Sequence, residues 1–148
     1  MNKVRRMKFD ELDKLLELYK HLNPEDMDMT GSDYIKRVWQ DICEDPNIIY
    51  FVIEEDDLLV SSCNISIIKN LTRQGRPYGL IENVVTHKDY RKRGYGKAVL
   101  QKAIEAAKER NCYKVMLMTS RKEESTLRFY EEAGFERGTK TGFVHKLK

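Results

Sequence analysis

The first third of the chain carries apolar residues at helical spacing, separated by polar breaks. Residues 4–7 predict a short first strand. Asp10 is suited to an N-cap, and the apolar positions behind it predict an amphipathic helix; they are Leu12, Leu15, Leu16, Tyr19 and Leu22. Asn23-Pro24 ends this helix, and a second helix is expected from near Ser32 to the break at Asp45-Pro46.

The middle of the chain changes to the pattern of strands. Residues 48–53 are rich in β-branched and aromatic side chains, residues 55–57 predict a turn, and residues 58–68 predict the facing strand of a hairpin. A polar connection over 70–77 leads to a strand over 78–86, with the sequence YGLIENVVT. Its alternation predicts one face that carries Leu80, Glu82, Val84 and Thr86.

The last third predicts a β-α-β unit followed by a further helix. An apolar stripe predicts a long helix over 94–110, and the nearly continuous apolar run 113–118 predicts a strand buried on both faces. Residues 123–133 predict the next helix, which Gly134 ends, and two short strands are expected within 135–147. The order β-α-α-β-β-β-α-β-α-β-β predicts a mixed α/β (α+β) fold.

The composition supports one folded domain over residues 1–148. The chain has 148 residues, 41% hydrophobic and 34% charged, which is too apolar for a disordered protein. Its formal net charge of +3 is too small to imply strong nucleic-acid binding. The positive residues cluster once, over 88–97, and no helix-turn-helix signature accompanies them. We therefore do not expect a nucleic-acid partner.

Membrane and metal chemistry are not expected either. No apolar run is long enough for a membrane span, and the first residues lack the apolar core of a signal peptide, so a cytoplasmic protein is predicted. Cys43, Cys63 and Cys112 show no C-x-x-C spacing, and His21 and His145 show no metal spacing. These residues predict neither a disulfide framework nor a metal site.

The segment RKRGYGK, residues 91–97, carries the clearest chemical signal. It directly follows a predicted strand and opens a predicted helix. Its glycines allow close backbone approach, and the free N–H groups of a helix start favour an anion such as phosphate. A dinucleotide-binding motif would need glycine at Val99. A P-loop would need glycine at Arg91 and a hydroxyl residue at Ala98, so neither motif fits.

The pattern R-x-x-G-x-G after a strand resembles the acetyl-CoA pyrophosphate loop of the GNAT superfamily of acyl-CoA-dependent N-acyltransferases. The stretch IENVVTHKDYRKRGYGKAVL is similar to the family's strand-loop-helix, and LRFYEEAGFE is similar to its F-Y-x-x-x-G-F signature. The resemblance is strongest over 78–137. It implies a mostly antiparallel central sheet with a β-α-β core, a splayed cleft between the fourth and fifth strands, and acetyl-CoA as acyl donor.

The resemblance also implies roles for individual residues. It places pantetheine on the backbone of Val84, Val85 and Thr86. It places the pyrophosphate on the loop formed by Arg91, Lys92, Arg93, Gly94, Tyr95, Gly96 and Lys97. Tyr130 matches the tyrosine that protonates the leaving thiolate, and Glu82 is the candidate base that takes the proton of the amine. The alternative for Glu82 is a structural carboxylate that bonds backbone or pairs with Arg73 or Arg76.

The expected reaction is direct transfer of acetyl to a primary amine of a small molecule. No cysteine or serine stands at a helix entry or elbow in the setting of a nucleophile that would argue for a covalent acyl-enzyme. A small amine, an amino acid and an amino sugar all stay open. ENVV and CYKV, together with F-Y-x-x-x-G-F, are similar to the hexosamine-phosphate N-acetyltransferases. A protein or peptide amine and a non-catalytic acyl-CoA-binding module are the alternatives, and the sequence allows a homodimer.

Overall fold

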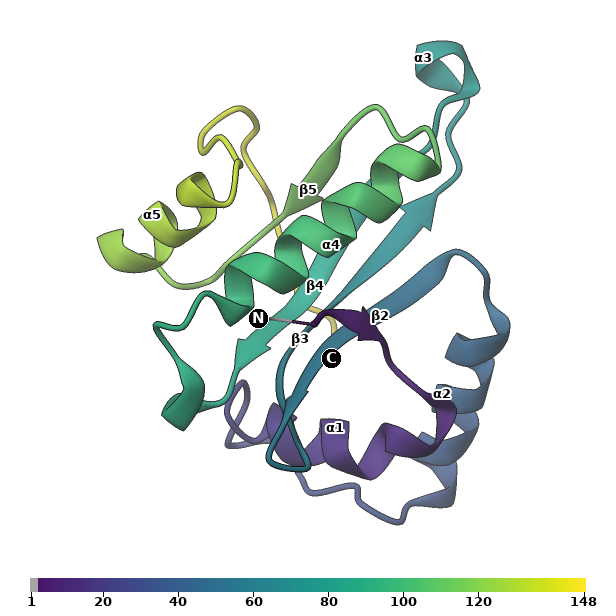
Figure 1. Ribbon diagram of the computed structural model, residues 1–148. Coiled ribbons are helices and arrows are strands. Elements are labelled where there is room, and N and C mark those ends of the chain that lie inside the picture. Colours follow the sequence, from purple (N-terminus) through teal and green to yellow (C-terminus); the bar gives the residue numbers. More distant parts are fainter. Residues whose placement is uncertain (1–2) are drawn as a thin grey trace. The chain divides into compact units, whose positions relative to one another are not determined.

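The computed structural model describes residues 3–148, and the chain folds into two compact units, one that ends at Leu117 and one from Met118 to Lys148. The first unit contains a five-stranded sheet in the order β1-β2-β3-β4-β5 (Figure 1). The strands are β1 (Arg5–Arg6), β2 (Ile48–Glu55), β3 (Leu58–Ile68), β4 (Tyr78–Thr86) and β5 (Val115–Leu117). Neighbours from β1 to β4 are antiparallel, whereas β5 runs parallel to β4, as the predicted β-α-β unit requires.

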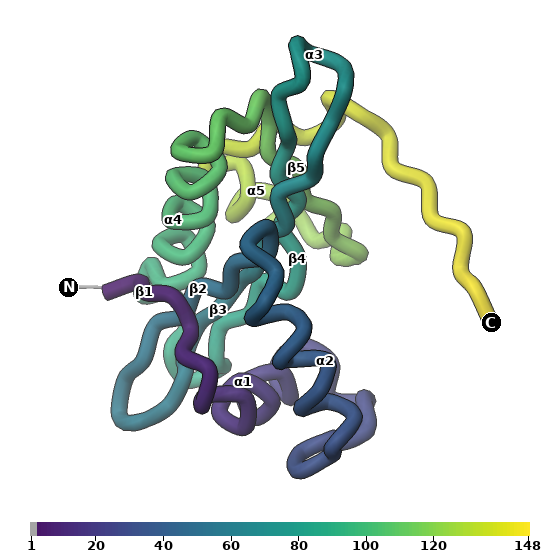
Figure 2. The backbone as a smooth tube through the Cα atoms, turned by 90° about the vertical axis from the view of Figure 1, so that its right-hand side faces the viewer, coloured from purple at the N-terminus to yellow at the C-terminus, as the bar shows by residue number. Residues whose placement is uncertain are grey.

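Helices cover both faces of this sheet. The helical segments are η1 (Phe9–Glu11), α1 (Leu12–Tyr19), α2 (Asp33–Glu44), α3 (Thr72–Gly75), η2 (Lys88–Tyr90) and α4 (Tyr95–Glu109). In Figure 2 the strands β2 to β4 lie between α4 and α2. The segment labelled α3 is a turn with left-handed backbone at Arg73 and Gln74. It lies in the polar connection that the sequence predicts over 70–77.

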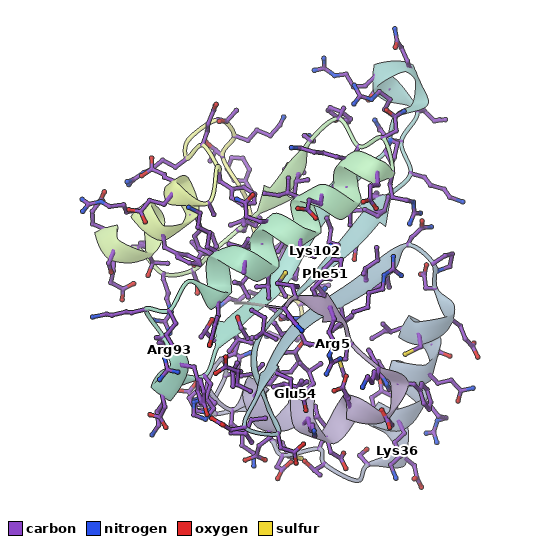
Figure 3. All side chains as sticks on the ribbon, in the orientation of Figure 1. Arg5, Lys36, Phe51, Glu54, Arg93 and Lys102 are labelled. Atoms are coloured by element: carbon purple, nitrogen blue, oxygen red, sulfur yellow. The ribbon has the colours of Figure 1, made fainter. Side chains whose placement is uncertain are left out.

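Alternation along the strands divides the core between two faces. On the α1 face, Val52 and Val85 pack with Leu15 and Leu18. On the α4 face, the buried Cys63 thiol donates to the Val99 carbonyl oxygen at 3.4 Å. Figure 3 shows Phe51 on the same face beneath α4, and Lys102 on the outer side of that helix. The amphipathic pattern therefore places α1 and α4 as their apolar stripes predict.

The start of α1 differs from the prediction. Asp10 is not its N-cap, because a 3₁₀ turn precedes the helix and places Glu11 at that position. The Glu11 carboxylate accepts from the Lys8 N–H at 2.7 Å and from both terminal nitrogens of Arg5, at 2.8 and 2.7 Å. The predicted cap of α2 is confirmed, since Ser32 Oγ accepts from the Ile35 N–H at 3.4 Å.

The strand after α4 and the tail are shorter in regular structure than the sequence predicts. β5 covers only residues 115–117, and these are half-buried rather than buried on both faces. The second unit contains α5 (Glu124–Glu132), which Gly134 ends with a φ of 104° as predicted. No strand forms within its residues 135–148, although two were expected. An isolated pair of short strands is only marginally stable in water, so an apolar pattern alone does not form a hairpin there.

Candidate active site

β4 contains a bulge at Asn83. This residue has a φ of 55°, in the left-handed region that asparagine tolerates better than most residues. The pairing of β3 with β4 shifts between Ser62 and Asn64, so that Asn83 and Val84 together stand opposite Cys63. The bulge therefore adds one residue to β4 in its centre.

Because of this bulge, the predicted faces of β4 are wrong beyond Glu82. Glu82 pairs with Asn64 and Val85 pairs with Ser62, and these two partners lie two residues apart on one face of β3. Val85, and not Val84, therefore shares the face of Glu82. Thr86 turns to the α4 face, where its hydroxyl lies 2.9 Å from Ser61 Oγ. The regular alternation holds only as far as Glu82.

The carboxylate of Glu82 is exposed on the α1 face. Among residues 3–148 it makes no ion pair, so the alternative pairing with Arg73 or Arg76 is absent. Arg76 instead donates to the carbonyl oxygens of Asn111 and Cys112, at 3.2 and 3.1 Å. The Arg73 guanidinium lies 5.6 Å from the centre of the Tyr113 ring. Glu82 is thus available to a ligand.

One edge of β4 is open beside Glu82. Pairing with β5 covers only Gly79, Leu80 and Ile81, and within the first unit the edge over residues 82–86 has no partner strand on that side. The His87 N–H donates to the Val60 oxygen at 2.8 Å, so alternation turns the backbone of Thr86 away from β3. The stretch Val84–Thr86, which the family resemblance assigns to pantetheine, lies on this open edge.

The loop of residues 91–97, called the phosphate loop below, joins η2 to α4. Gly94 occupies the N-cap of α4 with a φ of 84°, and no side chain caps the helix. The first intrahelical bond runs from the Ala98 N–H to the Gly94 oxygen at 3.0 Å. The N–H groups of Tyr95, Gly96 and Lys97 therefore precede the helical ladder and stay available for an anion. The left-handed Gly94 explains why the motif needs glycine there.

Aromatic side chains hold the phosphate loop in place. Tyr90 donates to Asp56 Oδ2 at 2.6 Å, and the buried Tyr95 donates to Glu55, a hydrogen bond that raises the pKa of the Tyr95 phenol. The Arg93 guanidinium lies over the Tyr90 ring, 4.8 Å from its centre. Figure 3 shows Arg93 on the loop before α4. Sequence reasoning missed Glu55 and Asp56, because no local pattern signals a contact so distant along the chain.

Tyr130 lies on α5, in the second unit. It is half-buried, with ring centroids 5.0 Å from Phe129 and 6.4 Å from Phe135. Its carbonyl oxygen accepts from the N–H groups of Ala133 and Phe135, both at 3.1 Å. The spacing F-Y-x-x-x-G-F thus builds one aromatic cluster at the end of a helix. Glu82, the open edge and the phosphate loop all belong to the first unit.

A separate hollow of about 410 Å³ lies beside α1, the start of β3 and His87, which follows β4. It is lined in part by Glu17, Leu59 and two histidines, His21 and His87, whose ring centroids lie 4.0 Å apart. Burial lowers the pKa of His21, and the neighbouring His87 lowers it further. In the described part of the chain, no three potential ligands gather to hold a metal ion. No helix of residues 3–148 is long and apolar enough to cross a membrane.

Comparison with known proteins finds a matching family and a similar solved structure. The model of the acetyltransferase (GNAT) family matches residues 12–135. A solved structure from Agrobacterium tumefaciens strain C58, described as "Putative acetyltransferase", superposes with a TM-score of 0.92. It is 41% identical, and the match covers 98% of this chain and 99% of that one.

Two curated relatives match over shorter lengths. Glucosamine 6-phosphate N-acetyltransferase of Trypanosoma brucei brucei is 42% identical over 77 residues, which are 52% of this chain and 50% of that protein. Streptothricin acetyltransferase A of Bacillus subtilis strain 168 is 47% identical over 58 residues, which are 39% of this chain and 34% of that protein. The match thus spans half or less of the length of either curated relative.

Proposed function

The chain belongs to the acetyltransferase (GNAT) family, and from this premise we propose that it moves the acetyl group of acetyl-CoA to a primary amine of a small molecule. The observation that carries the proposal is the combination of an anion-binding helix start with an open strand edge in one unit. Acetyl-CoA supplies the acetyl thioester and brings both a pyrophosphate and an amide-containing arm. The first unit offers a partner for each.

The phosphate loop binds the pyrophosphate. The N–H groups of Tyr95, Gly96 and Lys97 donate to its oxygens, and the positive end of the α4 dipole favours its charge. The same loop carries four basic residues, which favour an anion; they are Arg91, Lys92, Arg93 and Lys97. The open edge beside Val84 and Thr86 pairs with the amides of the pantetheine arm, as an added strand would.

Glu82 acts as the base. A primary amine with a pKa of about 10 arrives protonated at neutral pH, so a group at the site must remove that proton before attack. The exposed Glu82 carboxylate has no cationic partner among the described residues and stands on β4 at the start of the open edge. It takes the proton from the amine nitrogen, directly or through a water molecule.

Tyr130 acts as the acid. Its assignment rests on the match of LRFYEEAGFE to the family signature. A phenol with a pKa of about 10 is a suitable donor to a thiolate whose conjugate acid has a pKa near 8.5. Tyr130 Oη donates its proton to the departing sulfur.

The acceptor that we favour is a small amine, with an amino sugar as a concrete case. The two curated relatives are named as a glucosamine 6-phosphate N-acetyltransferase and a streptothricin acetyltransferase. Each of these names contains a small-molecule acceptor. A protein or peptide amine is the second candidate. Met118, where peptide N-terminus acetylating relatives often carry glutamate, disfavours it.

Release of free CoA thiol with a panel of amines tests the proposal. The panel contains glucosamine 6-phosphate, glucosamine, free amino acids, polyamines and peptides with a free N-terminus or lysine. Turnover with a small amine and not with peptides supports the proposal. Turnover with peptides alone moves the assignment to a protein acetyltransferase. A thermal shift with acetyl-CoA and no turnover with any amine indicates a non-catalytic acyl-CoA-binding module.

A further inference from the structure

A polar row crosses the α1 face of the sheet and ends at Glu82. The strands β2, β3 and β4 are neighbours (Figure 1), and their pairing aligns Tyr50 with Asn64 and Asn64 with Glu82. Directly opposite residues on antiparallel strands have Cβ atoms about 4.5–5.5 Å apart, with their side chains on one face. Asn64 is therefore the immediate cross-strand neighbour of the proposed base.

Asn64 is a buried polar side chain in the middle of an apolar strand. Only 7% of its surface is exposed, whereas Glu82 opposite is exposed. Nearby serines of β3 donate hydrogen bonds from their hydroxyls to backbone carbonyl oxygens. Ser62, for example, donates to the Phe51 oxygen at 2.9 Å. Asn64 has no such backbone bond among residues 3–148. The amide nitrogen is not fully buried, since Tyr19 Oη is the one side-chain polar atom of the described residues that is both fully buried and without a partner, so a ligand, a water molecule or a neighbour can reach it.

Asn83 fixes the direction of the Asn64 amide. Asn83 Nδ2 donates to Asn64 Oδ1 at 3.1 Å. The oxygen of the Asn64 amide is thereby turned to the bulge, and its nitrogen is turned the other way with both hydrogens free of partners in the described chain. A carboxylate is an acceptor that suits such a donor, and the carboxylate directly across the strand pair is Glu82.

We propose that Asn64 is a positioning residue for the reaction: no direct bond joins it to Glu82 among residues 3–148, and its Nδ2 donates through one water to one carboxylate oxygen of Glu82, which aims the other oxygen at the acceptor amine. The inference rests on the proposed function of Glu82. A carboxylate held in one rotamer is oriented for proton transfer from the amine more often than a freely rotating carboxylate. Asn83 serves the same arrangement one step further away, because it orients Asn64.

Substitutions at two positions test this arrangement by kinetics. Asn64→Asp keeps the shape and the oxygen that Asn83 bonds, but it removes both donors and adds a negative charge opposite Glu82. We expect kcat to fall about 10²-fold, with the acceptor KM and the acetyl-CoA thermal shift close to wild type. Asn83→Gly retains the left-handed backbone without strain and removes only the side-chain amide, so a smaller loss in kcat is expected. Asn111→Asp, the same change at an exposed position after α4, is the control and should leave kcat unchanged.

The double variant shows whether Asn64 acts through Glu82. If it does, Asn64→Asp causes little further loss of kcat once Glu82→Gln is present. Losses that multiply overturn the proposal, because Asn64 would then act independently of the base.

A measurement without turnover separates this proposal from the proposed function. The side-chain amide of Asn64 is assigned in a ¹⁵N–¹H spectrum by its absence from the Asn64→Asp variant. We expect its resonances to move as the pH is lowered from neutrality until carboxylates are protonated, and to stay in place in Glu82→Gln. If the Asn64 amide resonances show the same pH dependence in wild type and in Glu82→Gln, the positioning role is overturned, even where the enzyme is active. An amide that follows Glu82 supports the contact even where no acceptor is turned over.

Discussion

Tyr90 donates a hydrogen bond of 2.6 Å to Asp56, a residue 34 positions earlier in the chain. The bond joins the phosphate loop region to the turn between β2 and β3. Tyr95 makes a second link to that turn, at Glu55. Figure 3 shows Glu54, the residue before them, near Arg5, and these two side chains bond at 3.1 Å. The position of the anion site is therefore set by a hairpin turn rather than by the loop alone.

Tyr95→Phe should weaken acetyl-CoA binding without removing any group that touches it. The buried ring stays in place, but the link to Glu55 is lost and the start of α4 gains freedom. A hydrogen bond contributes about 0.5–1.5 kcal/mol net, so we expect the dissociation constant to rise about two- to tenfold. Calorimetric titration of the variant with acetyl-CoA measures this dissociation constant. Tyr113→Phe, at the start of the segment leading to β5, is the control and should bind as wild type.

Gly94→Val should abolish most of the stabilisation by acetyl-CoA. Gly94 has a φ of 84° at the start of α4, and a side chain there blocks backbone approach to the pyrophosphate. Wild type should gain about 2.7 kcal/mol of unfolding free energy at a ligand concentration of 100 times the dissociation constant. Gly75→Val carries similar strain, with a φ of 76° and open space around it, but lies away from the loop. If Gly94→Val folds and melts with the full acetyl-CoA shift, the loop assignment is wrong.

Glu82→Gln should lose rate most strongly at low pH. Removal of the amine proton is hardest when the pH lies far below the amine's pKa of about 10. We expect normal acetyl-CoA binding, a fall in kcat near neutrality, and partial recovery as the pH approaches the pKa of the amine. The pH–rate profile of a confirmed acceptor measures this. A loss of kcat that is constant across pH, or a loss of acetyl-CoA binding alone, would indicate that Glu82 has a structural role.

Tyr130→Phe should lower kcat about 10²–10⁴-fold, the range that a general acid contributes. The substitution keeps the ring contacts with Phe129 and Phe135 and removes only the hydroxyl. The acetyl-CoA thermal shift should match wild type. Tyr34→Phe, on the exposed face of α2, controls for loss of a hydroxyl elsewhere. Equal kcat values for Tyr130→Phe and wild type over a pH series would assign the residue to the core of its own unit.

Glu11→Gln should destabilise the fold at neutral pH and much less in acid. Hydrogen bonds from Arg5 lower the pKa of this buried carboxyl below its ordinary value of 4.5. A carboxyl with a lowered folded-state pKa stabilises the protein above pH 4.5, and that contribution is lost as the pH falls through the folded value. We expect about 1.5–3 kcal/mol at pH 7 from urea unfolding, and a smaller difference at pH 3. Glu17→Gln, which removes an exposed pair with Lys20, should have little effect at either pH.

Local patterns predicted those parts of the fold that local forces determine. The bounds of β4 agree with the prediction at both ends, and the cap at Ser32 and the stop at Gly134 were read from single residues. The bulge at Asn83 was missed, because period-2 alternation assumes a regular ladder and asparagine fits either conformation. The link from Tyr95 to Glu55 and the pair of Asn64 with Asn83 depend on strand register and long-range packing. These contacts have no signature in a window of neighbouring residues.

The bulge also gives β4 a residue that its pairing with β3 does not use. Because Asn83 and Val84 together oppose Cys63, the strand holds one residue more than its ladder with β3 requires. Removal of Asn83 would straighten β4 while leaving Val85 opposite Ser62 and still facing the core. Deletion of Asn83 thus removes the left-handed residue and the side chain that bonds Asn64 Oδ1 but leaves the pairing of Val85 intact, so this single change separates the needs of folding from those of catalysis.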